Sequence, residues 1–256
     1  MTQGRYGNFI DVANAKLFRD GIKAIEGRSA PEAAFVVMSG EWGLGKTHLG
    51  LNYAVQNDVP FVRLQPACTP HWVLTDWVTE LGEQPAHRTE GLFEQLIGIL
   101  AKRPRAVIFD ETEHALANGK VIDQIRGVVD AVEIPCVLLG REFIVQKLKG
   151  NPAVWSRVSS VVKFKRMAAD DMAKLIAARA GCKVDAELME RLLKETEGRM
   201  RLALGAADEL KRIAARSQAK ILTAADVAAR QLVKAEARPS ATTTAPGGPA
   251  QGGEEG

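Results

Sequence analysis

The chain has 256 residues, of which 46% are hydrophobic and 25% are charged, a composition typical of globular domains. Its formal net charge of +3 is too small to indicate a nucleic-acid-binding surface by itself, and it does not exclude one. We find no apolar run of about 18 residues and no secretory leader, so no membrane segment is expected. The three cysteines, Cys68, Cys136 and Cys182, lack C-x-x-C spacing, which fits a reducing cytoplasm and, for Cys136, a buried thiol.

Five short apolar runs predict the strands of a sheet, at residues 34–38, 60–64, 106–109, 135–139 and 158–164. They are rich in Val, Ile, Leu and Phe, as the buried strands of parallel sheets are. Segments with helical spacing alternate with them, such as the stripe Leu17, Phe18, Ile22 and Ile25 and the stripe Leu92, Phe93, Leu96, Ile97 and Leu100. This alternation predicts an α/β fold with an open, five-stranded, mainly parallel sheet flanked by helices.

After Lys165 we expect helices alone. A first one contains Met172, Leu175, Ile176 and Ala180 and ends at Gly181. Two more helices are predicted around 188–193 and over about 201–216. A fourth is expected after Thr223, because Thr223–Asp226 resembles a capping box. We therefore expect an α/β domain over 1–166, a small helical lid over 167–236 and a disordered tail over 237–256 without large apolar side chains.

A glycine-rich segment between Gly40 and Thr47 reads G-x-x-x-x-G-K-T, between a predicted strand and a predicted helix. Glycines let backbone N–H groups surround phosphate oxygens at the positive end of a helix. We expect Lys46 to reach the β- and γ-phosphates of ATP and the Thr47 hydroxyl to ligate Mg²⁺. The predicted nucleotide-binding residues are Gly40, Gly43, Leu44, Gly45, Lys46, Thr47 and His48. Trp42 occupies an unrestricted position of this loop, and we expect it to pack on a neighbouring loop or an adjoining protomer.

Two carboxylates follow the third predicted strand, at the end of the sheet where ligands bind in open α/β folds. We expect the Asp110 carboxylate to hold Mg²⁺ through water, and Glu111 to be the base that orients the attacking water. Glu113 and His114 come next, with ordinary polar loop roles expected for both. Together with the glycine loop, these residues predict an ATPase.

The segments GEWGLGKT and VIFDE, the five strands and the trailing helices together resemble an AAA+ ATPase, over residues 8–233. The resemblance implies that Arg157, before the last strand, is an arginine finger that reaches a neighbouring subunit's γ-phosphate. It also implies that Arg201, in EGRMRLAL, is the sensor 2 of the lid, with Arg199 as a close competitor. Guanidinium groups at such places stabilise charge on a transferring phosphoryl group.

The fourth predicted strand departs from that pattern. It ends in Gly140, Arg141 and Glu142 instead of the Asn or Thr that AAA+ proteins commonly use as sensor 1. Either Arg141 contacts the γ-phosphate instead, or hydrolysis is slow and stimulated by DNA or a partner.

The VLLGRE stretch and the short leader, a helix leading directly into the first strand, are similar to one AAA+ branch. This branch is the DNA transposition regulators, namely phage Mu transposition protein B, TnsC, TniB and IstB. The likeness implies an ATP-dependent oligomer that coats double-stranded DNA with little sequence preference and delivers it to, or activates, a transposase in DNA recombination. It would work in a bacterial cytoplasm, with a phage or transposon as its source. We expect a short form without the N-terminal helix-turn-helix domain.

Basic residues near the predicted strand ends are candidate DNA phosphate contacts, with a plain solvated charge as the alternative for each. They are Lys102, Arg103, Arg105, Lys120 and Arg126. Trp72 and Trp77 lie on one predicted helix and either pack in the core or face a partner. The rival functions are a replication initiator or helicase loader, and a signalling switch in which nucleotide controls protein assembly.

Overall fold

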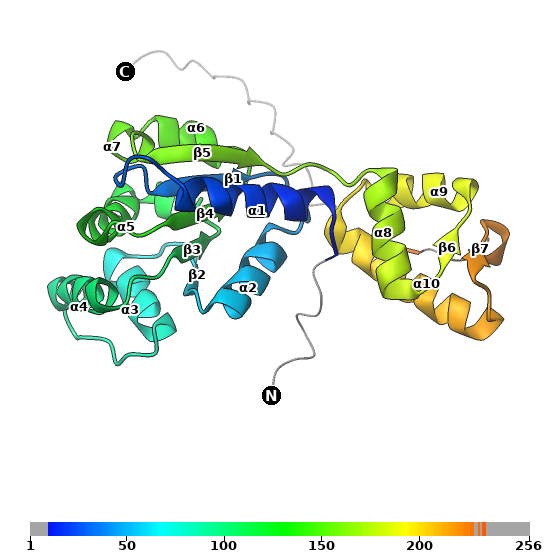
Figure 1. Cartoon of the computed structure of the whole chain (residues 1–256), viewed down its shortest axis with the longest axis horizontal. Helices are drawn as coiled ribbons and strands as arrows, with labels where there is room; N and C mark the ends of the chain where they lie inside the picture. Colours follow the sequence, from blue (N-terminus) through cyan, green and yellow to red (C-terminus); the bar gives the residue numbers. More distant parts are fainter. Residues whose placement is uncertain (1–9, 228–229, 231, 234–256) are drawn as a thin grey trace, which may run out of the picture.

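The computed structural model describes residues 10–227, 230, 232 and 233. A sheet domain and a mainly helical lid lie side by side along the long axis, and the segment after β5 joins them (Figure 1). No helix in the described part of the chain is long and apolar enough to cross a membrane. The segment predicted to be a disordered tail, 237–256, lies outside the described residues.

Five parallel strands form the main sheet, in the order β2-β3-β4-β1-β5. Their bounds are Phe35–Ser39 for β1, Phe61–Arg63 for β2, Val107–Asp110 for β3, Cys136–Gly140 for β4 and Val158–Lys163 for β5. Strands β1, β3 and β4 are buried along their whole length, whereas β5, at one edge, alternates between partly buried and exposed residues. The parallel sheet predicted from the apolar runs is therefore confirmed.

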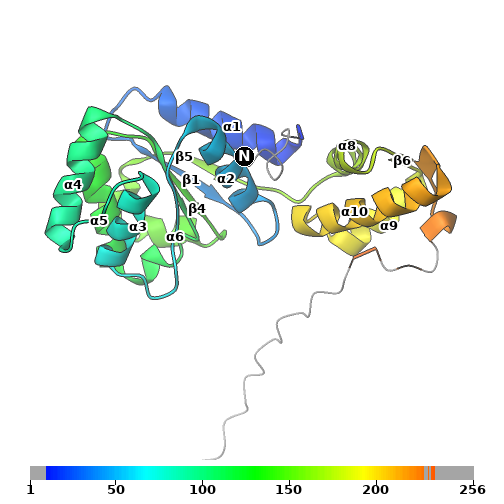
Figure 2. The same ribbon diagram turned by 90° about the horizontal axis from the view of Figure 1, so that it is seen from below.

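Helices cover both faces of this sheet (Figure 2). One face carries α1 (Ala13–Glu26) and α2 (Lys46–Asn57), against which Val36 and Met38 of β1 pack. The other face carries α3 (Pro70–Glu80), α4 (Thr89–Lys102), η1 (Ala115–Ala117), α5 (Gly119–Val132), α6 (Ile144–Lys149) and α7 (Pro152–Trp155). Phe35 and Val37 alternate with Val36 and Met38 and pack on that second face.

The two tryptophans of α3 have different environments. Trp77 is fully buried and meets the ring of Phe109 edge-on, with the ring centroids 5.2 Å apart. Trp72 is 43% exposed. Core packing therefore holds for Trp77, whereas Trp72 is available to solvent. All three cysteines are free and buried, as expected for Cys136.

The lid contains α8 (Ala169–Ala180), α9 (Ala186–Thr196) and α10 (Met200–Ser217). Two expectations are corrected here. The lid also holds a two-residue parallel pairing of β6 (Lys183–Val184) with β7 (Ile221–Leu222), segments too short for a period to reveal. After Thr223 the described residues form only the short 3₁₀ helix η2 (Ala225–Val227), although Asp226 does accept hydrogen bonds from the Thr223 N–H and hydroxyl, at 2.7 and 2.8 Å.

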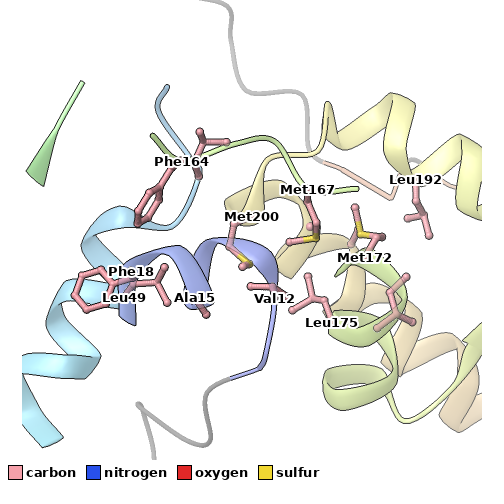
Figure 3. Close-up of a cluster of buried hydrophobic side chains, with 14 of the residues drawn as sticks. Val12, Ala15, Phe18, Leu49, Phe164, Met167, Met172, Leu175, Leu192 and Met200 are labelled. Carbon is pink, nitrogen blue, oxygen red and sulfur yellow. The ribbon is translucent and has the colours of Figure 1, made fainter. Parts of the chain in front are cut away.

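One hydrophobic core continues from the sheet domain into the lid (Figure 3). Figure 3 shows Val12 at the start of α1 beside Leu175 of α8, with Met167 of the connecting segment and Met200 of α10 close by. Polar contacts reinforce this junction, because the Asp171 carboxylate of α8 accepts from the Ala13 N–H at 3.1 Å. The lid is thus packed against α1 as well as connected by the chain.

Asn14 ties three segments together at that junction. Its side chain is buried, and its amide nitrogen donates to the carbonyl oxygens of Leu44, at 3.3 Å, and Lys165, at 2.8 Å. Its side-chain oxygen accepts from the Lys165 N–H at 2.9 Å. Asn14 of α1 therefore connects this helix, by hydrogen bonds, to both the glycine-rich loop and the segment that leads to the lid.

Candidate nucleotide-binding site

The glycine-rich loop leads from the end of β1 into the first turn of α2. Gly43 and Gly45 have φ angles of +75° and +93°, which L side chains rarely adopt, so glycine is required at both. Gly45 is the N-cap residue of α2. The loop therefore brings backbone N–H groups and the positive end of a helix to one place, the arrangement that binds phosphate.

Lys46 lies against this loop. Its Nζ donates to the carbonyl oxygens of Gly40 and Glu41, at 2.7 and 2.6 Å. Burial lowers the pKa of the Lys46 ammonium, and the nearby Glu113 and Asp110 carboxylates act in the opposite direction. Lys46 thus supplies a partly desolvated charge inside the site, where its attraction for phosphate is strongest.

Asp110, the last residue of β3, faces Thr47 across the site. The Thr47 hydroxyl is hydrogen-bonded to the Asp110 carboxylate, and burial raises the pKa of Asp110 against that contact. Asp110 Oδ2 is buried without a hydrogen-bond partner in the described structure, its nearest cation being Arg63, with Nε 3.5 Å away. An unfilled carboxylate oxygen beside a hydroxyl fits Mg²⁺, which prefers oxygen ligands and keeps several waters.

Glu111 has a φ angle of +57°, so its backbone is in the left-handed region that few residues other than glycine adopt. Its Oε2 lies 3.5 Å from Nε2 of His114, and its side chain is 44% exposed. Glu111 follows the last residue of β3 and lines the cavity, and this position supports a functional role for its carboxylate.

The lid closes the site from the other side through two arginines with different surroundings. Arg199 is buried, its guanidinium carbon lies 3.7 Å from the Trp42 ring centroid, and its Nη1 donates to the Trp42 carbonyl at 3.0 Å. Its Nη2 pairs with Glu41 at 3.2 Å and with Glu197 at 3.0 Å. Arg201 is exposed, and no described carboxylate pairs with it. Of the two competitors, Arg201 is therefore the one that is open to a ligand.

The first turn of α10 also touches the glycine-rich loop directly. The Arg201 N–H donates to the Gly43 carbonyl at 3.0 Å, and Met200 lies where a side chain at Gly45 would point, 3.3 Å from an added Cβ. Two helix N-termini, those of α2 and α10, thus meet at one cavity. Their dipoles both favour an anion there.

The cavity between loop, strand ends and lid has a volume of about 550 Å³. It brings together most of the predicted site residues, namely Gly43, Leu44, Gly45, Lys46, Thr47, His48, Asp110, Glu111 and Arg201. Gly40 lies just outside and holds Lys46 through its carbonyl. Burial lowers the pKa of His48, and the positive charge of Arg179 lowers it further.

Comparison with known proteins agrees with this geometry, because residues 30–148 match the family described as AAA domain. The chain has the AAA+ fold. Similar solved structures are the Aeropyrum pernix ORC2 protein in ADPNP–ADP complexes (17% identity, TM-score 0.58, 84% of this chain and 64% of that one) and Cdc6p from Pyrobaculum aerophilum (15%, 0.60, 88% and 67%). A third is the Aeropyrum pernix ORC1 protein in complex with DNA (18%, 0.56, 84% and 63%).

The chain spans less than two thirds of the length of either ORC protein. At these identities the likeness establishes the fold. No curated protein matches the chain in sequence.

Arg157 lies away from the cavity of its own AAA+ domain. Its carbonyl accepts from the N–H of Phe35 at the start of β1, whereas the glycine-rich loop follows the end of that strand. Its guanidinium pairs with Asp130, Nε to carboxylate oxygen, at 2.8 Å. A role for Arg157 at a phosphate therefore requires the site of another subunit and release from Asp130.

The basic residues predicted to contact DNA are distributed over several places. Arg103 and Arg105 both pair with Asp58, at 2.9 and 3.0 Å. Arg126 pairs with Asp130 at 3.3 Å, on α5. Lys102 and Lys120 are exposed, and Lys120 lines a separate hollow with His71. Three of the five charges are thus already paired within the chain.

Sequence reasoning underestimated several residues of the AAA+ site. Glu113, for which an ordinary loop role was expected, lines the cavity and binds Arg141 through Nε at 3.3 Å. Arg199 binds the loop through Trp42 instead of pointing into the cavity. The sequence signals for that contact were a tryptophan in the loop and the two arginines of RMR.

Proposed function

We propose that this protein binds Mg²⁺–ATP, hydrolyses it, and uses the nucleotide to control its assembly on DNA. The observation that carries the nucleotide part is the cavity where Lys46, Thr47, Asp110 and Arg201 converge. The DNA part is supported by the likeness to the ORC1 protein solved in complex with DNA. Hydrolysis is supported by Glu111, a carboxylate at the rim of the same cavity.

The residues of the site would have different roles in phosphoryl transfer. The loop N–H groups and Lys46 would bind the phosphates, and Thr47 and Asp110 would hold Mg²⁺, which supplies charge neutralisation for the transferring group. Glu111 would accept or orient the proton of a water, because a carboxylate is the base this position offers. Arg201 from the lid, and Arg157 from a neighbouring protomer, would stabilise negative charge that develops on the phosphate oxygens.

The first test replaces Lys46 by Ala and measures ATP binding by calorimetry together with ATP-dependent retention of duplex DNA. We expect both to be lost, because the desolvated ammonium is the main charge at the loop. Lys211→Ala, on an exposed position of α10, is the control for loss of one positive charge and is expected to bind normally. Unchanged ATP-dependent DNA retention in the Lys46 variant would contradict the proposal.

The second test is Glu111→Gln, which keeps the volume of the side chain and removes its charge. We expect nucleotide binding to persist while hydrolysis slows about 10²–10⁴-fold, the usual contribution of a general base. Assemblies on DNA should then accumulate. If hydrolysis proceeds at the normal rate in this variant, Glu111 is not the base.

Two AAA+ roles are compatible with such a cycle. The VLLGRE stretch favours a transposition regulator that delivers DNA to a transposase. The likeness to ORC1 and to Cdc6p favours an initiator or loader in replication. In either case protomers would share sites through Arg157, and weak backbone contacts to DNA would be multiplied along the assembly.

Electron microscopy of the protein with ATP, with and without duplex DNA, separates these roles. Filaments on DNA would favour the transposition regulator, and closed rings would favour the loader. Isolated particles with ATP and DNA at low salt would contradict both and favour a nucleotide switch without DNA. Arg157→Ala should prevent assembly-dependent hydrolysis without weakening ATP binding by the monomer.

A further inference from the structure

Glu113 and Arg141 form a pair at the edge of the sheet that faces the cavity. Glu113 follows β3, and Arg141 follows β4, which lies between β3 and β1. Asp110 ends β3, and the glycine-rich loop begins where β1 ends. The pair therefore stands between the metal-side carboxylate and the phosphate loop.

The carboxylate of Glu113 holds both the backbone and the side chain of Arg141. Glu113 Oε2 accepts from the Arg141 N–H at 3.2 Å, and Oε1 lies 3.3 Å from Arg141 Nε. This approach depends on Gly140, because a Cβ there would lie 2.7 Å from Glu113 Oε2. The glycine at the end of β4, which sequence reasoning treated as a departure from the AAA+ pattern, leaves room for this contact.

The guanidinium remains available for a ligand despite this pairing. Glu113 has a side chain that is 13% exposed, whereas that of Arg141 is 65% exposed. Within the described residues only Nε of the guanidinium has a protein partner, so both Nη groups are open. Arg141 and Glu113 line the same cavity as Lys46. The Glu113 carboxylate raises the pKa of Lys46, and the Arg141 guanidinium lowers it.

We propose that Glu113 is a positioning residue, which holds Arg141 so that its guanidinium contacts the terminal phosphate of a nucleoside triphosphate. The proposal rests on the nucleotide binding proposed above and adds a selectivity to it. A long, exposed arginine loses rotamer freedom when it binds, and a partner that fixes its stem in advance reduces that cost. A diphosphate has no group at the terminal position, so the pair distinguishes ATP from ADP.

The change in nucleotide affinity on neutralising Glu113 distinguishes a positioning role from a purely electrostatic one. A carboxylate in a phosphate site repels the ligand, so its removal should strengthen binding of both nucleotides if charge were its only effect. Positioning predicts the opposite sign for the triphosphate. Loss of triphosphate affinity on neutralising Glu113 is thus a specific signature.

The experiment measures dissociation constants of Mg²⁺–ADP and of a Mg²⁺-bound non-hydrolysable ATP analogue by calorimetry on the full chain. The variants are Glu113→Gln, Arg141→Ala and the double variant. Glu195→Gln is the matched control, since it neutralises a partly buried carboxylate that pairs with Arg191 in the lid, remote from the cavity. Thermal unfolding of each variant shows that it is folded.

We expect Glu113→Gln and Arg141→Ala each to weaken the triphosphate analogue about tenfold, the range for one charge-assisted contact, and ADP less than twofold. In the Arg141→Ala background, Glu113→Gln should cause no further loss of triphosphate affinity, because its unfavourable effect acts through Arg141. The inference is overturned if Glu113→Gln weakens ADP by the same factor, tightens both nucleotides, or has its full effect without Arg141. If the unmodified protein binds neither nucleotide, the proposed function fails instead.

Discussion

Arg199→Ala tests whether the lid is held on the glycine-rich loop by the contact with Trp42. The substitution removes a buried guanidinium that stacks on the Trp42 ring at 3.7 Å and donates to the Trp42 carbonyl at 3.0 Å. Both contacts join residues that lie 157 positions apart in the chain. Their loss should therefore loosen the docking of α10 on the loop, while α10 itself stays folded.

The magnitude follows from the individual contacts. A hydrogen bond from a charged donor contributes about 1.5–3 kcal/mol, and a cation–π contact about 0.5–2 kcal/mol. The ion pairs with Glu41 and Glu197 add about 0–1 kcal/mol, because those carboxylates are 32% and 50% exposed and both keep Arg166 as a partner. We expect docking to weaken by about 3 kcal/mol in total.

Hydrogen exchange of the Arg201 amide is the direct assay, because this N–H donates to the Gly43 carbonyl across the contact. A loss of about 3 kcal/mol accelerates its exchange about a hundredfold if exchange requires undocking. Arg166→Ala is the matched control, since Arg166 pairs with the same two carboxylates but is 48% exposed, and should change exchange less than fivefold. Equal effects of the two variants, or an unchanged Arg201 amide in Arg199→Ala, would refute this account.

Four further predictions concern packing, hydrogen bonding and titration. Gly50→Ala should destabilise the fold by about 1–3 kcal/mol in denaturant unfolding, since its Cβ would lie 2.6 Å from a Leu139 methyl carbon. Gly205→Ala, in α10 with no atom within 4 Å of the added carbon, should instead stabilise it by about 0.5–1 kcal/mol. Asn14→Ala leaves the backbone groups of Lys165 without their partner and should cost about 1–3 kcal/mol; a loss below 0.5 kcal/mol would contradict the role of that side chain. Burial, and then Glu26, raises the pKa of Tyr53 to about 12, so stability should fall as the pH rises from about 10 to 12, and Tyr53→Phe should remove both that fall and the late step in tyrosinate absorbance.

Much of the architecture is encoded locally and was predictable. The apolar runs of β1, β3 and β4 are buried on both faces, so their composition alone identifies central parallel strands. The phosphate loop was predictable for a similar reason, because its glycines, Lys46 and Thr47 are contiguous and their roles follow from backbone geometry. Asp110 and Glu111 were predicted as site carboxylates because they stand at the end of a strand.

Other features depend on which distant segments meet, and no local pattern carries that information. Arg199 and Arg201 lie two positions apart and compete for the sensor 2 role in the sequence, yet one is buried on Trp42 and the other borders the cavity. Glu113 can contact Arg141 because β4 lies beside β3 and ends in Gly140, which leaves space for the Glu113 carboxylate. The pairing of β6 with β7 joins segments of two residues each, which is too short for a period.

Hydrophobic periodicity and glycine chemistry act over a few residues, so the order of amino acids is enough to predict a parallel α/β domain with a glycine-rich loop and a helical lid. How the lid meets the loop depends on contacts between distant segments, namely Arg199 on Trp42 and the shared core around Met200. The same long-range contacts set which charges are open at the cavity and which, such as Arg103 and Arg105, are paired elsewhere. Charges act on whatever lies within a few ångströms, and only the folded chain sets those neighbours.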